Sequence, residues 1–422
     1  MSLPQPTKNR WLIALAAIGI HLCIGSVYAW SVFSKPLQSA FGWSLSETQL
    51  TFGLAIFMLG FSAAFMGRMV ERRGPKVAGL VATFFWSGGL AGAGVAVSDW
   101  IELPRDRLIC LYLCYGILGG IGLGTGYVTP VSSLIKWFPD RRGLATGLAI
   151  MGFGFASFLG APLIGDLITR IGLSQTFWCL AVAYLIIMGV SSMYLEPPPE
   201  GWRPKMGSTA PKVRERRDDL MPMKASRAVK TLPFYGLWFM MYINITCGIA
   251  LISVASPLTQ EMTGASALAA AGVVGVIGLF NGFGRIGWAS LSDFLGRPQT
   301  FMVFFVIEMG LFLLMPALGD LLLFQIALYL IMTCYGGGFA TLPAYIGDLF
   351  GTQEVSAIHG YILTAWALAG LSGSTLAATI REMTGNYTAM MQAFSGLFAV
   401  AFLVALGMFG FVRWKTRQSI RG

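Results

Sequence analysis

Charged residues are scarce in this sequence. Aspartate, glutamate, lysine and arginine make up 11% of the 422 residues, whereas hydrophobic residues make up 55%. A soluble protein of this length needs a far larger charged surface to stay in solution. The composition therefore excludes an ordinary soluble globular protein.

Histidine and cysteine are also few, with two and six residues. All six cysteines fall inside apolar runs, so we expect ordinary packing there and neither a disulfide nor a bound metal. No nucleophile–base pair, metal cluster or phosphate-binding loop stands at a recognisable spacing. The sequence therefore predicts neither an enzyme nor a cofactor.

Long apolar runs are abundant, and each is long enough to cross about 30 Å of hydrocarbon as a helix. Backbone groups in lipid must bond within their own segment, so these runs must be helical. The first run is too long for a cleaved signal and lacks a small-residue cleavage site. The sequence predicts an all-α polytopic membrane protein with twelve transmembrane helices. The predicted segments are 11–33, 49–69, 77–98, 107–134, 143–168, 174–195, 234–258, 266–290, 300–318, 321–347, 356–380 and 388–412.

The excess of positive charge lies at alternate ends of these segments. Basic residues cluster before the first segment, after the second and fourth, and at the carboxyl end of the chain. By the positive-inside rule both termini are cytoplasmic, as an even number of helices requires. We expect the plasma membrane of a bacterium, its inner membrane, as the location.

A basic, proline-containing stretch at 196–233 separates residues 1–195 from 234–422, with six predicted helices on each side. It has the character of a cytoplasmic linker lying near anionic lipid headgroups. Nucleic-acid binding is the competing interpretation, but no aromatic platform or known motif accompanies the basic run. We therefore expect no nucleic-acid partner.

The two halves of the sequence carry the same residue types at matching positions. Two six-helix halves with a binding site near the membrane midplane are typical of secondary transporters. The matched positions are Glu71 with Asp293, Gly74 with Gly296, Pro130 with Pro343, and Gly147 with Gly360.

The loop after the second helix resembles the signature of the major facilitator superfamily, G-x-x-x-[D/E]-[R/K]-x-G-x-[R/K]. It is matched in full by Gly67, Glu71, Arg72, Gly74 and Lys76, whereas the copy after the eighth helix is degenerate. The resemblance implies a cytoplasmic gate that latches the outward-open state. Its residues would be Gly67, Glu71, Arg72, Gly74, Asp293 and Arg297.

Three further stretches resemble the oxalate/formate exchanger family, a bacterial relative of the animal monocarboxylate porters. They are GSVYAWSVFSKPL (25–37), WFPDRRGLATG (137–147) and LFNGFGRIGWASLSDFLGR (279–297). The resemblance implies transport of small carboxylates by alternating access.

Arg285 is the one lysine or arginine that the twelve-helix map places deep in a membrane segment. A charge there costs about 2.5 kcal/mol or more, so such a residue usually faces the bundle interior. Its planar guanidinium can hold a carboxylate by two parallel hydrogen bonds. We expect Arg285 to bind the substrate; the alternative is a structural ion pair with Glu308.

Other substrate-binding residues follow from the family resemblance. It implies Tyr127, Tyr335, Phe339 and Tyr28 as cavity residues, and Asn281 lies one turn before Arg285. Trp366 stands where the oxalate exchanger has a lysine facing the arginine. One cation beside a bulky ring suits a monoanion, which favours lactate-like or pyruvate-like substrates over oxalate.

Proton coupling has three candidates: His21, His359 and Glu308, each of which has structural packing as its alternative. Asn281 occupies the position of a proton-linked aspartate in the animal porters and cannot titrate.

The sequence thus predicts a secondary active monocarboxylate transporter, coupled to protons or exchanging anions, with the bilayer as its surroundings; a transporter-like sensor is the other alternative. A monomer is sufficient for this mechanism.

Overall fold

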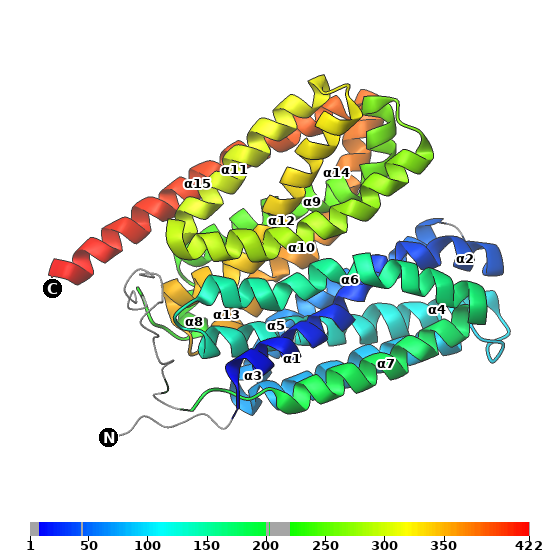
Figure 1. Ribbon diagram of the computed structural model, residues 1–422, viewed down its shortest axis with the longest axis horizontal. Helices are drawn as coiled ribbons and strands as arrows, with labels where there is room; N and C mark the ends of the chain where they lie inside the picture. Colours follow the sequence, from blue (N-terminus) through cyan, green and yellow to red (C-terminus); the bar gives the residue numbers. More distant parts are fainter. Residues whose placement is uncertain (1–7, 44, 200–201, 203–219, 422) are drawn as a thin grey trace. The chain divides into compact units, whose positions relative to one another are not determined.

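The computed structural model describes residues 8–43, 45–199, 202 and 220–421 (Figure 1). Every regular element among these residues is a helix, which confirms the predicted all-α class. Several basic residues of the predicted linker lie outside the described residues: Arg203, Lys205, Lys212, Arg214, Arg216 and Arg217.

The described residues form the following elements in chain order. They are α1 (Arg10–Gly25), η1 (Ser26–Ala29), α2 (Ser31–Phe41), α3 (Leu45–Ala96), α4 (Pro104–Leu111), η2 (Tyr112–Gly119), α5 (Gly120–Trp137), α6 (Arg142–Ile171), α7 (Leu173–Tyr194), α8 (Ala225–Ala228), α9 (Leu232–Thr263), α10 (Ala267–Leu295), α11 (Arg297–Leu314), η3 (Met315–Ala317), α12 (Leu321–Phe350), α13 (Val355–Ile362), α14 (Thr364–Thr384) and α15 (Thr388–Arg421).

Each of the twelve predicted segments is helical over most of its length. Among the described residues, nine helices are long and apolar enough to cross a membrane. One of them, Leu50–Ala96, covers two predicted segments. The two predicted segments outside these nine correspond to α10 and to α13 with α14.

The backbone of α3 breaks at Gly74, where the two predicted segments meet. Gly74 has φ +80° and ψ 166°, a conformation that side chains rarely tolerate, and Pro75 follows it without an N–H donor. The signature glycine therefore allows the chain to leave one helix and start the next within a single residue.

Glycines also let α5 lie directly against α3. A Cβ at Gly122 would overlap the backbone N of Trp86, and one at Gly124 would overlap Leu59 O. The Trp86 indole Nε1 in turn donates to Cys23 O of α1 at 3.1 Å. These contacts fix the part of α5 that carries Tyr127.

By their internal contacts the residues group into two compact units. Unit 1 comprises Met1–Pro139, Leu148–Lys205 and Ser356–Ala367; unit 2 comprises Asp140–Gly147, Met206–Val355 and Leu368–Gly422. The division at 196–233 stays a prediction.

Candidate functional site

Arg285 is fully buried in unit 2, on α10. Its Nε donates to Asn281 Oδ1 at 3.1 Å, which joins two residues one helical turn apart. The guanidinium carbon lies 5.1 Å from the centroid of the Phe339 ring. The amide and the aromatic ring both orient the guanidinium, and the ring face adds a cation–π attraction.

The helix opposite, α12, carries Tyr335 and Phe339, whose ring centroids are 5.3 Å apart. Close approach to α10 depends on Gly336, because a Cβ there would overlap Asn281 O. Four predicted residues on α10 and α12 are thus brought together: Arg285, Asn281, Tyr335 and Phe339.

A buried amide that the sequence analysis missed lies on α9. Asn244 is fully buried, and neither its Nδ2 nor its Oδ1 bonds to a described residue. A Cβ on Gly338 would lie 2.9 Å from the Asn244 Nδ2, so Asn244 packs beside the residue preceding Phe339. An asparagine inside an apolar segment was the available sequence signal.

Unit 1 holds the remaining predicted cavity residues in one aromatic cluster. Tyr127 on α5 is fully buried, and its ring lies 5.2 Å from that of Trp366 on α14 and 5.7 Å from that of Phe153 on α6. The Tyr28 ring of η1 packs edge-on against Phe153 at 4.9 Å. The structure therefore brings Tyr28, Tyr127 and Trp366 around Phe153.

Both histidines belong to the same cluster. The His21 ring of α1 lies 5.4 Å from the Tyr127 ring, and the His359 ring of α13 lies 5.8 Å from it. His359 Nε2 is buried and has no hydrogen-bond partner among the described residues.

Glu308 lies elsewhere in unit 2, on α11. It is 1% exposed. Its Oε2 has no hydrogen-bond partner among the described residues, and no ion pair joins Glu308 to Arg285. The structural ion pair weighed as the alternative role for Arg285 is therefore not formed.

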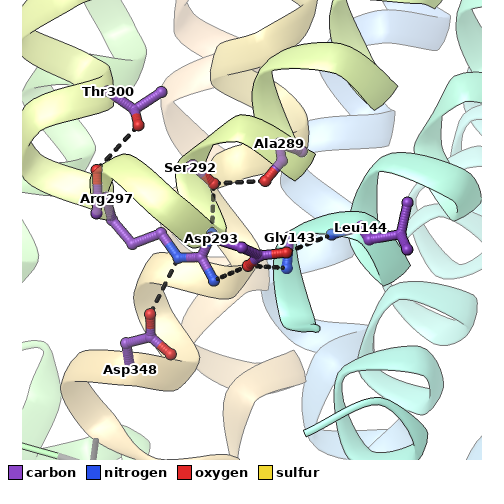
Figure 2. Close-up of polar contacts among 9 residues, drawn as sticks. Gly143, Leu144, Ala289, Ser292, Asp293, Arg297, Thr300 and Asp348 are labelled. Carbon is purple, nitrogen blue, oxygen red and sulfur yellow. Dashed lines mark hydrogen bonds and ion pairs between the residues drawn. The ribbon is translucent and has the colours of Figure 1, made fainter. Parts of the chain in front are cut away.

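The second copy of the signature surrounds Asp293 (Figure 2). Its carboxylate accepts from the backbone N–H of Gly143 at 2.9 Å and of Leu144 at 3.1 Å, at the start of α6. Arg297 Nη2 donates to the same carboxylate at 2.6 Å. A negative charge is favourable there because the first amides of a helix have no intrahelical acceptor.

Arg297 extends this network to α12 (Figure 2). Its Nε donates to Asp348 Oδ2 at 3.0 Å, and its Nη1 donates to Ser292 Oγ. The side chains of Arg297 and Asp293 are each 8% exposed. Arg297 thus holds two carboxylates from different helices.

The first copy of the signature is arranged in the same way in unit 1. Glu71 accepts from Lys136 Nζ at 2.6 Å and from the backbone N–H of Ser356 at 3.0 Å, at the start of α13. Gly67 touches the same turn, since a Cβ there would overlap Ser356 O. Arg72 is exposed and has no ion-pair partner among the described residues.

The sequence analysis missed two partners in these networks. Lys136 and Asp348 end α5 and α12, so each charge stands one turn or less from the end of an apolar segment. That position was the available signal, but the sequence did not show which opposite charge each would meet.

The comparison with protein families is decisive for the fold and the class of activity. The model of the Major Facilitator Superfamily matches residues 14–374. The chain belongs to the major facilitator superfamily. As a member of the major facilitator superfamily it is a multi-pass membrane protein and a secondary transporter, not an enzyme.

Individual relatives are distant but cover nearly the whole chain. An uncharacterised transporter of the superfamily, YhjX of Escherichia coli, is 27% identical over 371 residues, which are 86% of each chain. The oxalate:formate antiporter of Oxalobacter formigenes is 27% identical over 387 residues, 91% of this chain and 88% of the relative. Human monocarboxylate transporter 11 is 24% identical over 433 residues, 96% of this chain and 85% of the relative.

A solved structure has the same fold. The crystal structure of the superfamily transporter FucP in the outward conformation superposes with a TM-score of 0.70 at 16% identity, over 93% of this chain and 97% of FucP.

Proposed function

We propose that this protein transports small monocarboxylates, such as lactate or pyruvate, by alternating access and coupled to protons. The observation that carries the proposal is the buried guanidinium of Arg285, oriented by Asn281 and stacked on Phe339. A buried cation is costly in a membrane protein unless an anion compensates it. A carboxylate matches its fork in both charge and geometry.

The relatives support a carboxylate as the substrate class. Two of them are named for carboxylates, an oxalate:formate antiporter and a monocarboxylate transporter. These names favour a carboxylate as the substrate class, and the choice among carboxylates rests on the residues of this chain. Trp366 is fully buried and uncharged, which favours a monoanion over a dianion that would need a second compensating group.

The two signature networks supply the gate of the proposed cycle. Asp293 and Glu71 each hold the first amides of a distant helix, α6 and α13. We place these ends on the cytoplasmic side of a bacterial inner membrane, with both termini cytoplasmic. Breaking and forming these contacts would then accompany the change of access.

The direct test is uptake of labelled lactate into proteoliposomes by Arg285 variants. Two charge-assisted hydrogen bonds are each worth about 1.5 kcal/mol or more, so Arg285→Ala should weaken binding roughly 100-fold. Arg285→Lys should recover little, because an ammonium lacks the planar fork. Exposed Arg170 provides the matched control, and Arg170→Ala should transport normally. Normal uptake by Arg285→Ala would show that another residue binds the substrate.

Anion exchange is the second candidate, favoured by the similarity to an oxalate:formate antiporter. Proteoliposomes loaded with unlabelled carboxylate would distinguish the two. A proton symporter accumulates lactate when only a pH gradient is imposed. An obligate exchanger takes up label only when a counter-anion is present inside.

A further inference from the structure

The two histidines of the chain meet at one tyrosine. His21 and His359 come from opposite ends of the sequence, yet both rings pack against Tyr127 at centroid distances of 5.4 Å and 5.8 Å. All three side chains are nearly or fully buried. Packing alone would be served equally well by apolar side chains, which carry no desolvation cost.

The geometry at His359 favours a role in binding over packing. Its buried Nε2 has no hydrogen-bond partner among the described residues, and a polar atom in that condition costs about 1–3 kcal/mol. A proton at this nitrogen with an anion beside it would satisfy the atom. Two neighbouring imidazoles repel each other when both are charged, so the pair is suited to hold one proton.

The described charged residues on the helices around the pair lie near helix ends or beside the break in α3 at Gly74. On the adjacent α3, the carboxylate of Glu71 is neutralised by Lys136 at 2.6 Å, and Arg68 lies over the Tyr361 ring on the exposed side. Away from the helix ends, the other unexposed titratable side chains of α1, η1, α5, α7 and α13 are thiols and phenols, uncharged in their ordinary state at neutral pH. They are Cys23 on α1, Tyr28 on η1, Tyr127 on α5, Tyr184 on α7 and Tyr361 on α13.

We propose that His21, Tyr127 and His359 form the proton-binding site of the transport cycle, and that protonation of one imidazole is linked to binding of the substrate anion. Proton and anion then favour each other's binding, and this coupling is reciprocal. No covalent step is involved; the proton enters with the anion and leaves with it. The inference rests on the proposed carboxylate transport and assigns its coupling site.

The first experiment uses the unaltered protein and the fact that it has two histidines. Ring-labelled ¹³C-histidine protein, purified with a tag that lacks histidine, should give two imidazole resonances. Adding lactate at neutral pH should move at least one of them to the imidazolium position. If both resonances keep their neutral shifts on lactate binding between about pH 5 and 8, the proposal is wrong.

The second experiment separates a histidine-held proton from one carried by lactate itself. Linkage to one proton makes lactate affinity change by up to about tenfold per pH unit above the pKa of the site. The variant His21→Gln with His359→Gln should lose this slope, and Cys23→Ala, a buried neighbour on α1, should keep it. In proteoliposomes the double variant should still exchange lactate but fail to accumulate it under a pH gradient. An unchanged slope and unchanged accumulation in the double variant would overturn the inference.

Different results would contradict the proposed function and the proposed proton site. If the unaltered protein shows no counterflow with any monocarboxylate, the proposed function is wrong. If counterflow occurs while the histidine resonances keep their neutral chemical shifts, only the assignment of the proton site is wrong.

Discussion

Replacing Asp293 by asparagine tests the gate most sharply. The carboxylate holds three donors: the amides of Gly143 and Leu144 and the guanidinium of Arg297. A hydrogen bond to a charged acceptor is worth about 1 kcal/mol more than one to a neutral acceptor. Asp293→Asn should therefore weaken the three hydrogen bonds by about 3 kcal/mol in total. That corresponds to a shift of roughly 100-fold in the equilibrium between gate-closed and gate-open states.

The chain contains a matched control for this substitution. Asp166 and Arg170 form an ion pair with the same four-residue spacing, at 2.8 Å, but their side chains are 53% and 73% exposed. Exposed pairs contribute little because water screens them. Asp166→Asn should therefore change the equilibrium constant between gate-closed and gate-open states by no more than about threefold.

Spin labels on the first turn of α6 and the last turn of α10 would report the distance between these ends. In Asp293→Asn the distance distribution should shift toward the separated population, and pH-driven lactate uptake should fall. Lactate binding should be retained, because Arg285 is untouched. Equal distributions in Asp293→Asn and Asp166→Asn would refute the idea that buried charge holds the gate.

Two further substitutions test selectivity and coupling. Trp366→Lys should weaken lactate transport by leaving an ammonium without a partner, and should let oxalate compete with labelled lactate. Equal competition by oxalate in the unaltered protein would show that one cation does not set selectivity. Glu308→Gln should retain pH-driven accumulation if the histidine pair carries the proton, since Glu308 belongs to α11 of unit 2 and the pair belongs to unit 1. Loss of accumulation with exchange intact would move the coupling site to Glu308.

Much of the fold was predictable because membrane segments obey a simple rule. Every backbone group in hydrocarbon must form its hydrogen bond within the protein, so an apolar run of sufficient length is expected to form a transmembrane helix. Arg285 was predictable for a related reason, since a charge inside such a run stands out against its neighbours. Both inferences depend on residues adjacent in sequence.

The meeting of the two histidines at Tyr127 could not be predicted in this way. It depends on how α1, α5 and α13 pack, and these three helices are far apart in the sequence. The partners of the gate residues posed the same difficulty. Glu71 could have met any of several basic residues, and only the packed helices select Lys136.

The repeat alignment reveals what was duplicated and what was not. Gly147 packs against Arg285 O, and its counterpart Gly360 packs against Ala63 O, so the close approach recurs at matched positions in each half. Asp293 and Glu71 likewise each hold the start of a matched helix. The guanidinium has no such counterpart, because Ala63 stands at the equivalent position. A second buried cation would cost about 2.5 kcal/mol or more and would need a second negative charge to compensate it. A monoanion supplies one, so a single arginine without a repeat counterpart, in an otherwise repeated frame, fits the proposed monocarboxylate substrate.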